Sequence, residues 1–180
     1  YEEWKLLLSV AAIATVGDVM QLKDENRIIV RHGLRALEKA KNLGLRALLQ
    51  VCELENKELT AYHIGFIIGP CLNASGRLKT AKLALELLMS KDMETAKQRA
   101  MELKRLNDER KDMTQQGVDQ AIEIVEAAPE EKVLVVYLSD CHESLAGIIA
   151  GRLRERYQRP AIVLTDAQEE GILKGSGRSI

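Results

Sequence analysis

Hydrophobic side chains recur at helical spacing over the first half of the chain. Over residues 3–14 the apolar positions fall three and four residues apart, which places them on one face of a helix. The same spacing predicts further helices from residue 24 or 25 to about 42, at 45–54 and at 80–90. Thr60 is expected to cap another helix that Pro70 ends, and "GPCLNASGRL" at 69–78 to form an irregular connection between helices.

One long helical segment follows. Between Asp92 and Ala128 there is no proline and a single glycine, helix-forming residues dominate, and Pro129 closes the run. At about 1.5 Å per residue, such a helix would be on the order of 55 Å long. Because its middle, "KRLNDERKDMTQQ", is polar, we expect it to connect two domains and not to lie in one core.

The pattern changes after Pro129. "KVLVVYL" and "PAIVLT" are apolar runs of strand length on either side of a helical segment, "SLAGIIAGRLRERY", and "GILKGSGRSI" offers a third strand. Strand, helix and strand at this spacing predict a βαβ unit with parallel strands. The expected fold class is therefore α/β, with a helical part, a long connecting helix and a βαβ parallel sheet.

Composition narrows the class of protein. Hydrophobic residues make up 46% of the chain and charged residues 29%, which is ordinary for a soluble globular protein. The longest apolar run, residues 6–16, is too short to span a bilayer, so no membrane contact is expected. Three cysteines without a CxxC pair and three scattered histidines favour a reducing, cytoplasmic location and argue against structural zinc.

The overall charge gives no general signal for nucleic acid. The formal net charge is -1, and only 3% of the residues are aromatic, so any contact with nucleic acid should depend on phosphates more than on bases. One local exception is a basic stripe at i, i+4 spacing, formed by Arg27, Arg31, Arg35 and Lys39. Such a stripe is either a solvated helix face or a surface that follows a phosphate backbone.

Two short stretches have the chemistry of an anion site. In "KGSGRS", residues 174–179, glycines let backbone amides approach an oxyanion, Ser176 adds a hydroxyl and Arg178 adds a planar fork that matches phosphate. "NASGR" repeats part of this chemistry with Asn73 and Arg77. The alternatives are a glycine-rich hairpin or a strand with a bulge for the first stretch and an ordinary helix linker for the second.

Candidates of other kinds lie in two places. "YLSDCHESLAG" follows the first predicted strand, at the position where open α/β sheets bind ligands. His142 is therefore a candidate ligand-binding residue, and Ser144 is expected to be the N-cap of the next helix. The alternative is that this segment is a solvated loop. Asp18 directly follows the first predicted helix. An unpaired carboxylate is costly to bury, so Asp18 should cap, pair or ligate a divalent ion.

Five motifs in order along the chain resemble the RecJ family: "ATVGDVMQLKDENR", "GFIIGPCLNASGRL", "LNDER" in the long helix, "CHESLAGIIAGRLRERYQRPAIVL" and "KGSGRSI". Members are single-strand-specific DNA exonucleases of the DHH phosphoesterase superfamily. The resemblance implies the C-terminal portion of a DHH domain at 1–90, a connecting helix at 91–129 and the N-terminal portion of a DHHA1-type domain at 130–180. It also implies metal-dependent, 5′-to-3′ hydrolysis of phosphodiester bonds in single-stranded DNA, in repair and recombination.

The resemblance also implies roles for individual residues. Asp18 matches the last acidic motif of the DHH domain, whose aspartate ligates the catalytic Mn²⁺ or Mg²⁺ ions. The family residues that line the pocket for the 5′ phosphate and backbone of single-stranded DNA match a set from two motifs, Asn73, Arg77, Ser176, Gly177 and Arg178. His142 stands where the family has a histidine, although this chain has His-Glu-Ser where the family often has His-Pro-Gly. Cys71 stands where many members have a basic residue.

The Asp-His-His triplet of the superfamily does not occur in the chain. A two-metal phosphodiesterase needs several carboxylates and a histidine, so Asp18 alone is not enough. We therefore expect the chain to be part of a longer RecJ-like enzyme and inactive by itself. Two alternatives stay open: a non-catalytic module that binds nucleic acid or nucleotide phosphates, and a DHH-superfamily phosphodiesterase acting on short oligonucleotides, cyclic dinucleotides or pyrophosphate. The long helix and "GPCLNASGR" favour the RecJ assignment over the second alternative.

Overall fold

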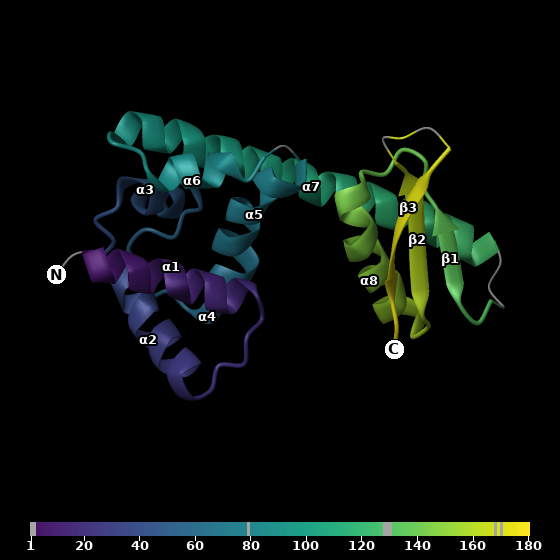
Figure 1. Cartoon of the computed structure of the whole chain (residues 1–180), viewed down its shortest axis with the longest axis horizontal. Coiled ribbons are helices and arrows are strands. Elements are labelled where there is room, and N and C mark those ends of the chain that lie inside the picture. Colours follow the sequence, from purple (N-terminus) through teal and green to yellow (C-terminus); the bar gives the residue numbers. More distant parts are fainter. Residues whose placement is uncertain (1–2, 79, 128–130, 168, 170) are drawn as a thin grey trace. The chain divides into compact units, whose positions relative to one another are not determined.

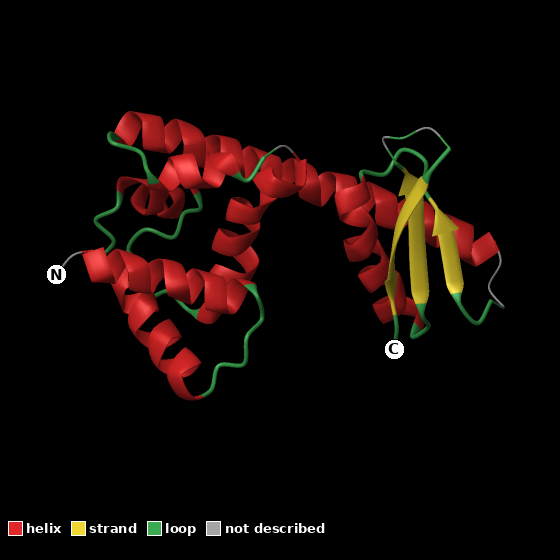
Figure 2. Cartoon of the chain, in the orientation of Figure 1, coloured by secondary structure: helices red, strands yellow, loops and turns green. Residues whose placement is uncertain are grey.

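The computed structural model describes residues 3–78, 80–127, 131–167, 169 and 171–180. The chain divides into two compact units, Tyr1–Asp108 and Glu109–Ile180, each with its own hydrophobic core. The described part of the first unit is helical, and the strands lie in the second (Figure 2). Within the described ranges no helix combines the length and the hydrophobicity needed to cross a membrane.

The first unit contains the helices that the hydrophobic spacing predicts (Figure 1). Its elements are α1 (Glu3–Gly17), α2 (Asp24–Glu38), α3 (Leu43–Val51), α4 (Ala61–His63), α5 (Gly69–Leu78), α6 (Lys82–Leu88) and the first part of α7 (Met93–Ala127). The predicted helices near 3–14, 24–42, 45–54 and 80–90 are thus confirmed, with their ends shifted by a few residues. The long helix is confirmed as well; its predicted end at Ala128 and Pro129 lies outside the described residues.

Close packing of α1 against α2 depends on a glycine. A Cβ atom at Gly33 would lie 2.3 Å from the Cβ of Ala12 and 2.6 Å from the carbonyl oxygen of Leu8. Val30 and Leu37, on the same side of α2, are buried in the core of this unit. The opposite side of α2 is consequently left to solvent.

The stretch after Thr60 differs from the prediction. Thr60 precedes α4 as expected, and its backbone N–H donates to Nδ1 of His63 at 3.0 Å. Pro70, however, does not end the helix: a π-helical turn at Ile64–Ile68 leads directly into α5, so 69–78 is helical and not irregular. The N–H of Gly69 donates to the carbonyl oxygen of Ile64, five residues back, so Pro70 follows a π-helical turn and not an uninterrupted α-helix.

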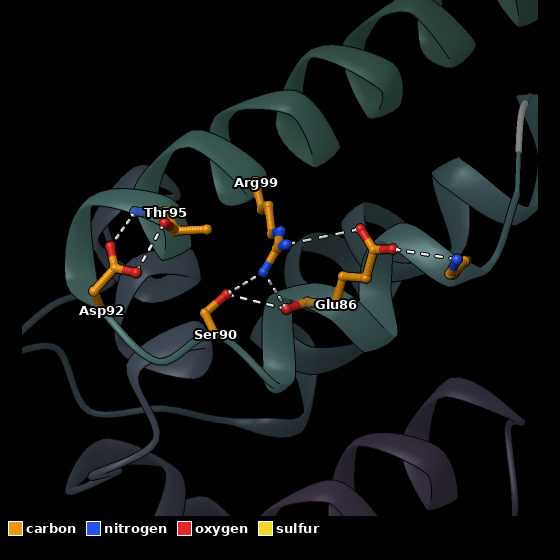
Figure 3. A network of polar contacts seen from close by, with 6 residues as sticks. Glu86, Ser90, Asp92, Thr95 and Arg99 are labelled. Atoms are coloured by element: carbon orange, nitrogen blue, oxygen red, sulfur yellow. Dashed lines mark hydrogen bonds and ion pairs between the residues drawn. The ribbon is translucent and has the colours of Figure 1, made fainter.

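Side chains fix the start of α7. Asp92 accepts the backbone N–H of Thr95 at 2.7 Å and its hydroxyl at 2.9 Å, which satisfies a donor that the helix leaves unpaired (Figure 3). Arg99, two turns further, donates to the carbonyl oxygen of Glu86 at 2.8 Å and to Oγ of Ser90 at 3.0 Å (Figure 3). These bonds attach the end of α6 to α7.

The second unit is a small sheet covered on one face by helices. Its strands are β1 (Leu134–Tyr137), β2 (Ala161–Asp166) and β3 (Leu173–Arg178), in the order β1-β2-β3, and α8 (Ala146–Tyr157) connects β1 to β2. Alternate side chains of β1 and β2 are buried against residues of α8 and of the last part of α7. The βαβ unit is confirmed, because β1 and β2 pair in parallel.

The third strand departs from the expected parallel sheet. β3 pairs with β2 in antiparallel register, so the sheet is mixed. Only residues 167–172 separate the two strands. A parallel strand needs a crossover of a dozen or more residues, whereas a short connection permits only a hairpin.

Candidate phosphate-binding site

The glycine-rich stretch "KGSGRS" lies largely on β3, which is an edge strand of the sheet. Side chains alternate along a strand, so Lys174, Ser176 and Arg178 share one face. Gly175 stands on the other face, where a Cβ atom would lie 2.8 Å from the carbonyl oxygen of Val163 on β2. The backbone of this stretch is therefore part of a hairpin, as one alternative proposed. The side chains of Lys174, Ser176 and Arg178, on the face opposite Gly175, are the ones that could contact a ligand.

Arg178 and Ser176 lie together over the start of α8. Nη1 of Arg178 donates to Oγ of Ser176 at 3.0 Å and to the carbonyl oxygen of Gly177 at 2.8 Å. A Cβ atom at Gly147 would lie 2.8 Å from Nη2 of Arg178 and 2.9 Å from Oγ of Ser176. The guanidinium and the hydroxyl thus occupy space that only a glycine at the first turn of α8 leaves open.

These groups are suited to an anion. Arg178 is exposed, and no ion pair joins it to a carboxylate of the described residues, so its positive charge is uncompensated. A guanidinium donates along several directions in one plane and matches phosphate oxygens. The adjacent first turn of α8 adds the partial positive charge of a helix N-terminus.

His142 has a structural role at the entrance to α8. A 3-10 turn at Glu143–Leu145 precedes the helix, and Nδ1 of His142 accepts the backbone N–H of Ser144 at 3.3 Å. The same nitrogen lies 2.8 Å from Oγ of Ser144. The cap of this turn is therefore His142, and the N-cap position of α8 is held by Leu145. The expectation that Ser144 is the N-cap is wrong, because Ser144 lies inside the 3-10 turn that precedes the helix.

An ion pair joins this turn to β3. Nζ of Lys174 lies 2.7 Å from Oε2 of Glu143, and the bond to the lysine lowers the pKa of the Glu143 carboxyl. The sequence places Glu143 in the loop after β1 and Lys174 on β3, but it does not predict that the two residues pair. The pair could be predicted only from the antiparallel direction of β3, which brings the start of β3 near the end of β1.

The remaining candidates belong to the first unit. Asn73 and Arg77 are exposed on α5 and stand four residues apart, which places them on one face of that helix. Asp18 follows the end of α1, and its backbone N–H donates to the carbonyl oxygen of Ala14 at 2.9 Å. Its side chain is exposed, so the expected cost of burying this carboxylate does not arise. Cys71, in contrast, is buried in the core.

The described residues do not form a metal site by themselves. No group of three or more His, Cys, Asp or Glu side chains in the described ranges is arranged to hold a metal ion. Asp18 therefore offers at most one carboxylate, and a two-metal centre requires several ligands around each ion.

The sequence of the chain was compared with family models and with curated proteins. No family model matches it. The chain is 41% identical over 175 residues to the single-stranded-DNA-specific exonuclease RecJ of Bacillus subtilis and 36% identical over 180 residues to RecJ of Escherichia coli, in both cases over 97% of its length. The chain is a RecJ homologue. It spans 22% and 31% of the length of these two relatives.

Solved RecJ structures agree with this assignment. The crystal structure of Thermus thermophilus RecJ in complex with Mg²⁺ has a TM-score of 0.83 and 31% identity to this chain, over 96% of the chain and 27% of RecJ. A second structure, of RecJ bound to manganese, has a TM-score of 0.82 and 31% identity, over 96% of the chain and 43% of RecJ. The mixed α/β fold described above is thus RecJ-like.

Gly147 is a further residue of the candidate phosphate site, and the sequence motifs do not single it out. It belongs to a series of small residues in α8, Ala146, Gly147, Ala150 and Gly151. Its position under Arg178 could not be predicted, since it follows from the register of β3 on β2. RecJ homology alone does not identify this contact.

Proposed function

We propose that this chain is the segment of a metal-dependent, single-stranded-DNA-specific 5′-to-3′ exonuclease that holds the phosphate backbone of the strand. The observation that carries this proposal is the placement of Arg178 and Ser176 over Gly147 at the start of α8. RecJ relatives described as single-stranded-DNA-specific exonucleases support the choice of substrate. The enzyme is proposed to act in DNA repair and recombination in the cytoplasm.

In the second unit, Ser176, Gly177 and Arg178 are proposed to contact the 5′ phosphate or the backbone of the strand, with His142 holding the turn before α8. In the first unit, Asn73 and Arg77 are proposed as further contacts to the strand. The guanidinium groups supply positive charge and directional donors, and the hydroxyl and amide groups add neutral hydrogen bonds. Few bases can stack on a chain with so few aromatic residues, so recognition by phosphate contacts fits the composition.

Hydrolysis is proposed to require more ligands than the described residues provide. RecJ structures contain Mg²⁺ or Mn²⁺, and Asp18 is our candidate for one carboxylate ligand of such a centre. The absence of a three-ligand cluster among the described residues favours a second candidate for the chain taken alone, a phosphate-binding module without activity. Release of mononucleotides from single-stranded DNA by the isolated chain with Mn²⁺ would contradict this part of the proposal.

The pocket is tested by binding of oligo-dT that carries a 5′ phosphate. Arg178→Ala should weaken binding about tenfold or more, because a hydrogen bond to a charged group contributes about 1.5–3 kcal/mol. The affinity of Arg178→Lys should lie between those of the unchanged chain and Arg178→Ala, since lysine keeps the positive charge but lacks the planar guanidinium group. The matched control is Arg152→Ala, which removes an exposed arginine of α8. Equal losses for Arg178→Ala and Arg152→Ala would overturn the assignment.

A further inference from the structure

The outer face of α2 carries a row of basic side chains, which we call the α2 ridge. It consists of Arg27, Arg31 and Arg35 on the helix and of Lys23 and Lys39 at its N-cap and C-cap positions, each four residues from the next. All five are exposed, because α2 turns Val30, Gly33 and Leu37 toward the core. At about 1.5 Å per residue, the ridge extends roughly 24 Å along the helix with a charge about every 6 Å.

The ridge has no internal compensation of charge. Asp24 and Glu38 lie within one turn of Arg27 and Arg35, yet no ion pair joins either acid to the ridge in the described structure. Oε1 of Glu38 accepts the backbone N–H of Leu59 at 2.8 Å instead. Like charges four residues apart destabilise a helix, so this arrangement is unfavourable for α2 alone.

Basic residues on α7, in the same unit, form ion pairs with neighbouring acids. On α7, Nζ of Lys104 lies 2.7 Å from Oδ2 of Asp108, and Nε of Arg105 lies 3.0 Å from Oε2 of Glu102. Basic and acidic residues are nearly equal in number over the whole chain, 26 against 27. An unpaired row of five bases is therefore not a result of a basic composition.

We propose that the α2 ridge is a second nucleic-acid surface, which contacts successive phosphates of a single strand. The inference rests on the proposed single-stranded DNA substrate but on different residues. Regularly spaced cations suit a polymer with regularly spaced phosphates, and three of the five are arginines, whose planar groups match phosphate oxygens. The five residues that make up the ridge include no aromatic side chain, so its contribution should not depend on base sequence.

The test compares two triple variants of equal charge. Arg27→Gln, Arg31→Gln and Arg35→Gln remove the centre of the ridge. Lys57→Gln, Lys91→Gln and Lys97→Gln remove three exposed lysines that lie dispersed over the same unit. Binding of oligo-dT and of oligo-dA is measured from low to moderate salt for both variants and for the unchanged chain.

We expect the ridge variant to bind both oligonucleotides more weakly and to lower the slope of log affinity against log salt by about 2, from about 0.7 per lost phosphate contact on a single strand. Its thermal midpoint should not fall, because repulsion within α2 is relieved. Equal losses of affinity in the two triple variants, or an unchanged salt slope in the ridge variant, would contradict the proposal that the ridge binds nucleic acid. If the unchanged chain binds neither oligonucleotide, this proposal and the proposed function both fail. If only Arg178→Ala loses affinity, the proposed function is kept and the ridge proposal is wrong.

Discussion

Gly147 on α8 leaves the space into which Arg178 of β3 extends: a Cβ atom at position 147 would lie 2.8 Å from Nη2 of that arginine. The same atom would lie 2.9 Å from Oγ of Ser176. The absence of a side chain on one element thus leaves room for two candidate phosphate-binding groups on another. A substitution at position 147 therefore tests the proposed site and leaves both candidate side chains chemically unchanged.

Gly147→Ala should weaken binding of single-stranded DNA without unfolding the protein. The added methyl group displaces Arg178 and Ser176, and loss of one charge-assisted hydrogen bond corresponds to about a tenfold weaker affinity. The fold should be retained, because the two contacted atoms are the ends of side chains that can move aside, and alanine favours helix by roughly 0.5–1 kcal/mol over glycine. Fluorescence anisotropy with labelled oligo-dT measures the affinity, and thermal unfolding monitors the fold.

A second glycine of the same helix provides the matched control. A Cβ atom at Gly151 would meet no atom within 4 Å, so Gly151→Ala should leave binding unchanged. If Gly147→Ala binds DNA as tightly as Gly151→Ala does, the position of Arg178 over α8 is not required for binding. If both variants bind weakly, the effect belongs to helix α8 in general.

The residue pattern predicts elements better than it predicts the site. Apolar spacing identifies the helices, the long α7 and the βαβ unit, because each depends on residues close in sequence. The direction of β3 follows from the short connection at 167–172 and not from apolar spacing, so the expected parallel sheet was wrong. The continuation of the helix through Pro70 is not evident from apolar spacing, since it depends on a π-helical turn. Arg178 could be named from its motif, but its contact with Gly147 joins residues 31 positions apart and needs the sheet register.

Stability should fall at acid pH through the cap of α7. The Thr95 backbone N–H and hydroxyl lower the pKa of Asp92 below its ordinary value of 3.8. A carboxyl with a lowered pKa in the folded state stabilises the fold above its ordinary pKa, and this contribution is lost as pH falls through the folded value. We therefore expect the difference in thermal midpoint between the unchanged chain and Asp92→Asn to shrink between pH 6 and pH 3.

Asparagine is a suitable replacement because it also caps helices but does not titrate in this range. Asp92→Ala, which removes the cap altogether, should be less stable than Asp92→Asn at every pH. A constant difference between the unchanged chain and Asp92→Asn down to pH 3 would show that the charge of Asp92 does not contribute.

Cys52 and Cys71 form a pair that their sequence spacing does not suggest. Their Sγ atoms lie 3.9 Å apart, with Cys52 at the end of α3 and Cys71 buried on α5. The hydrogen bond with Cys71 and burial raise the pKa of the Cys52 thiol. We expect diamide to link the two cysteines: a sulfur–sulfur bond forms, both thiol hydrogens pass to the azo nitrogens, and the reagent becomes a hydrazine.

The rate and the consequence of this oxidation both have a predicted direction. Thiolate is the attacking species, so the raised pKa should make the reaction slow at neutral pH and faster as pH rises. The bond would close a loop of 19 residues, which corresponds to about 3 kcal/mol of stabilisation if the native geometry is kept. Peptide mass mapping under non-reducing conditions identifies the linked pair, and chemical denaturation measures the stability.

Cys52→Ser and Cys71→Ser should each abolish both effects and leave Cys141 reduced. Links that involve Cys141, or dimers in place of an intramolecular bond, would contradict the packing of α3 against α5, because only that packing brings the two sulfurs within reach.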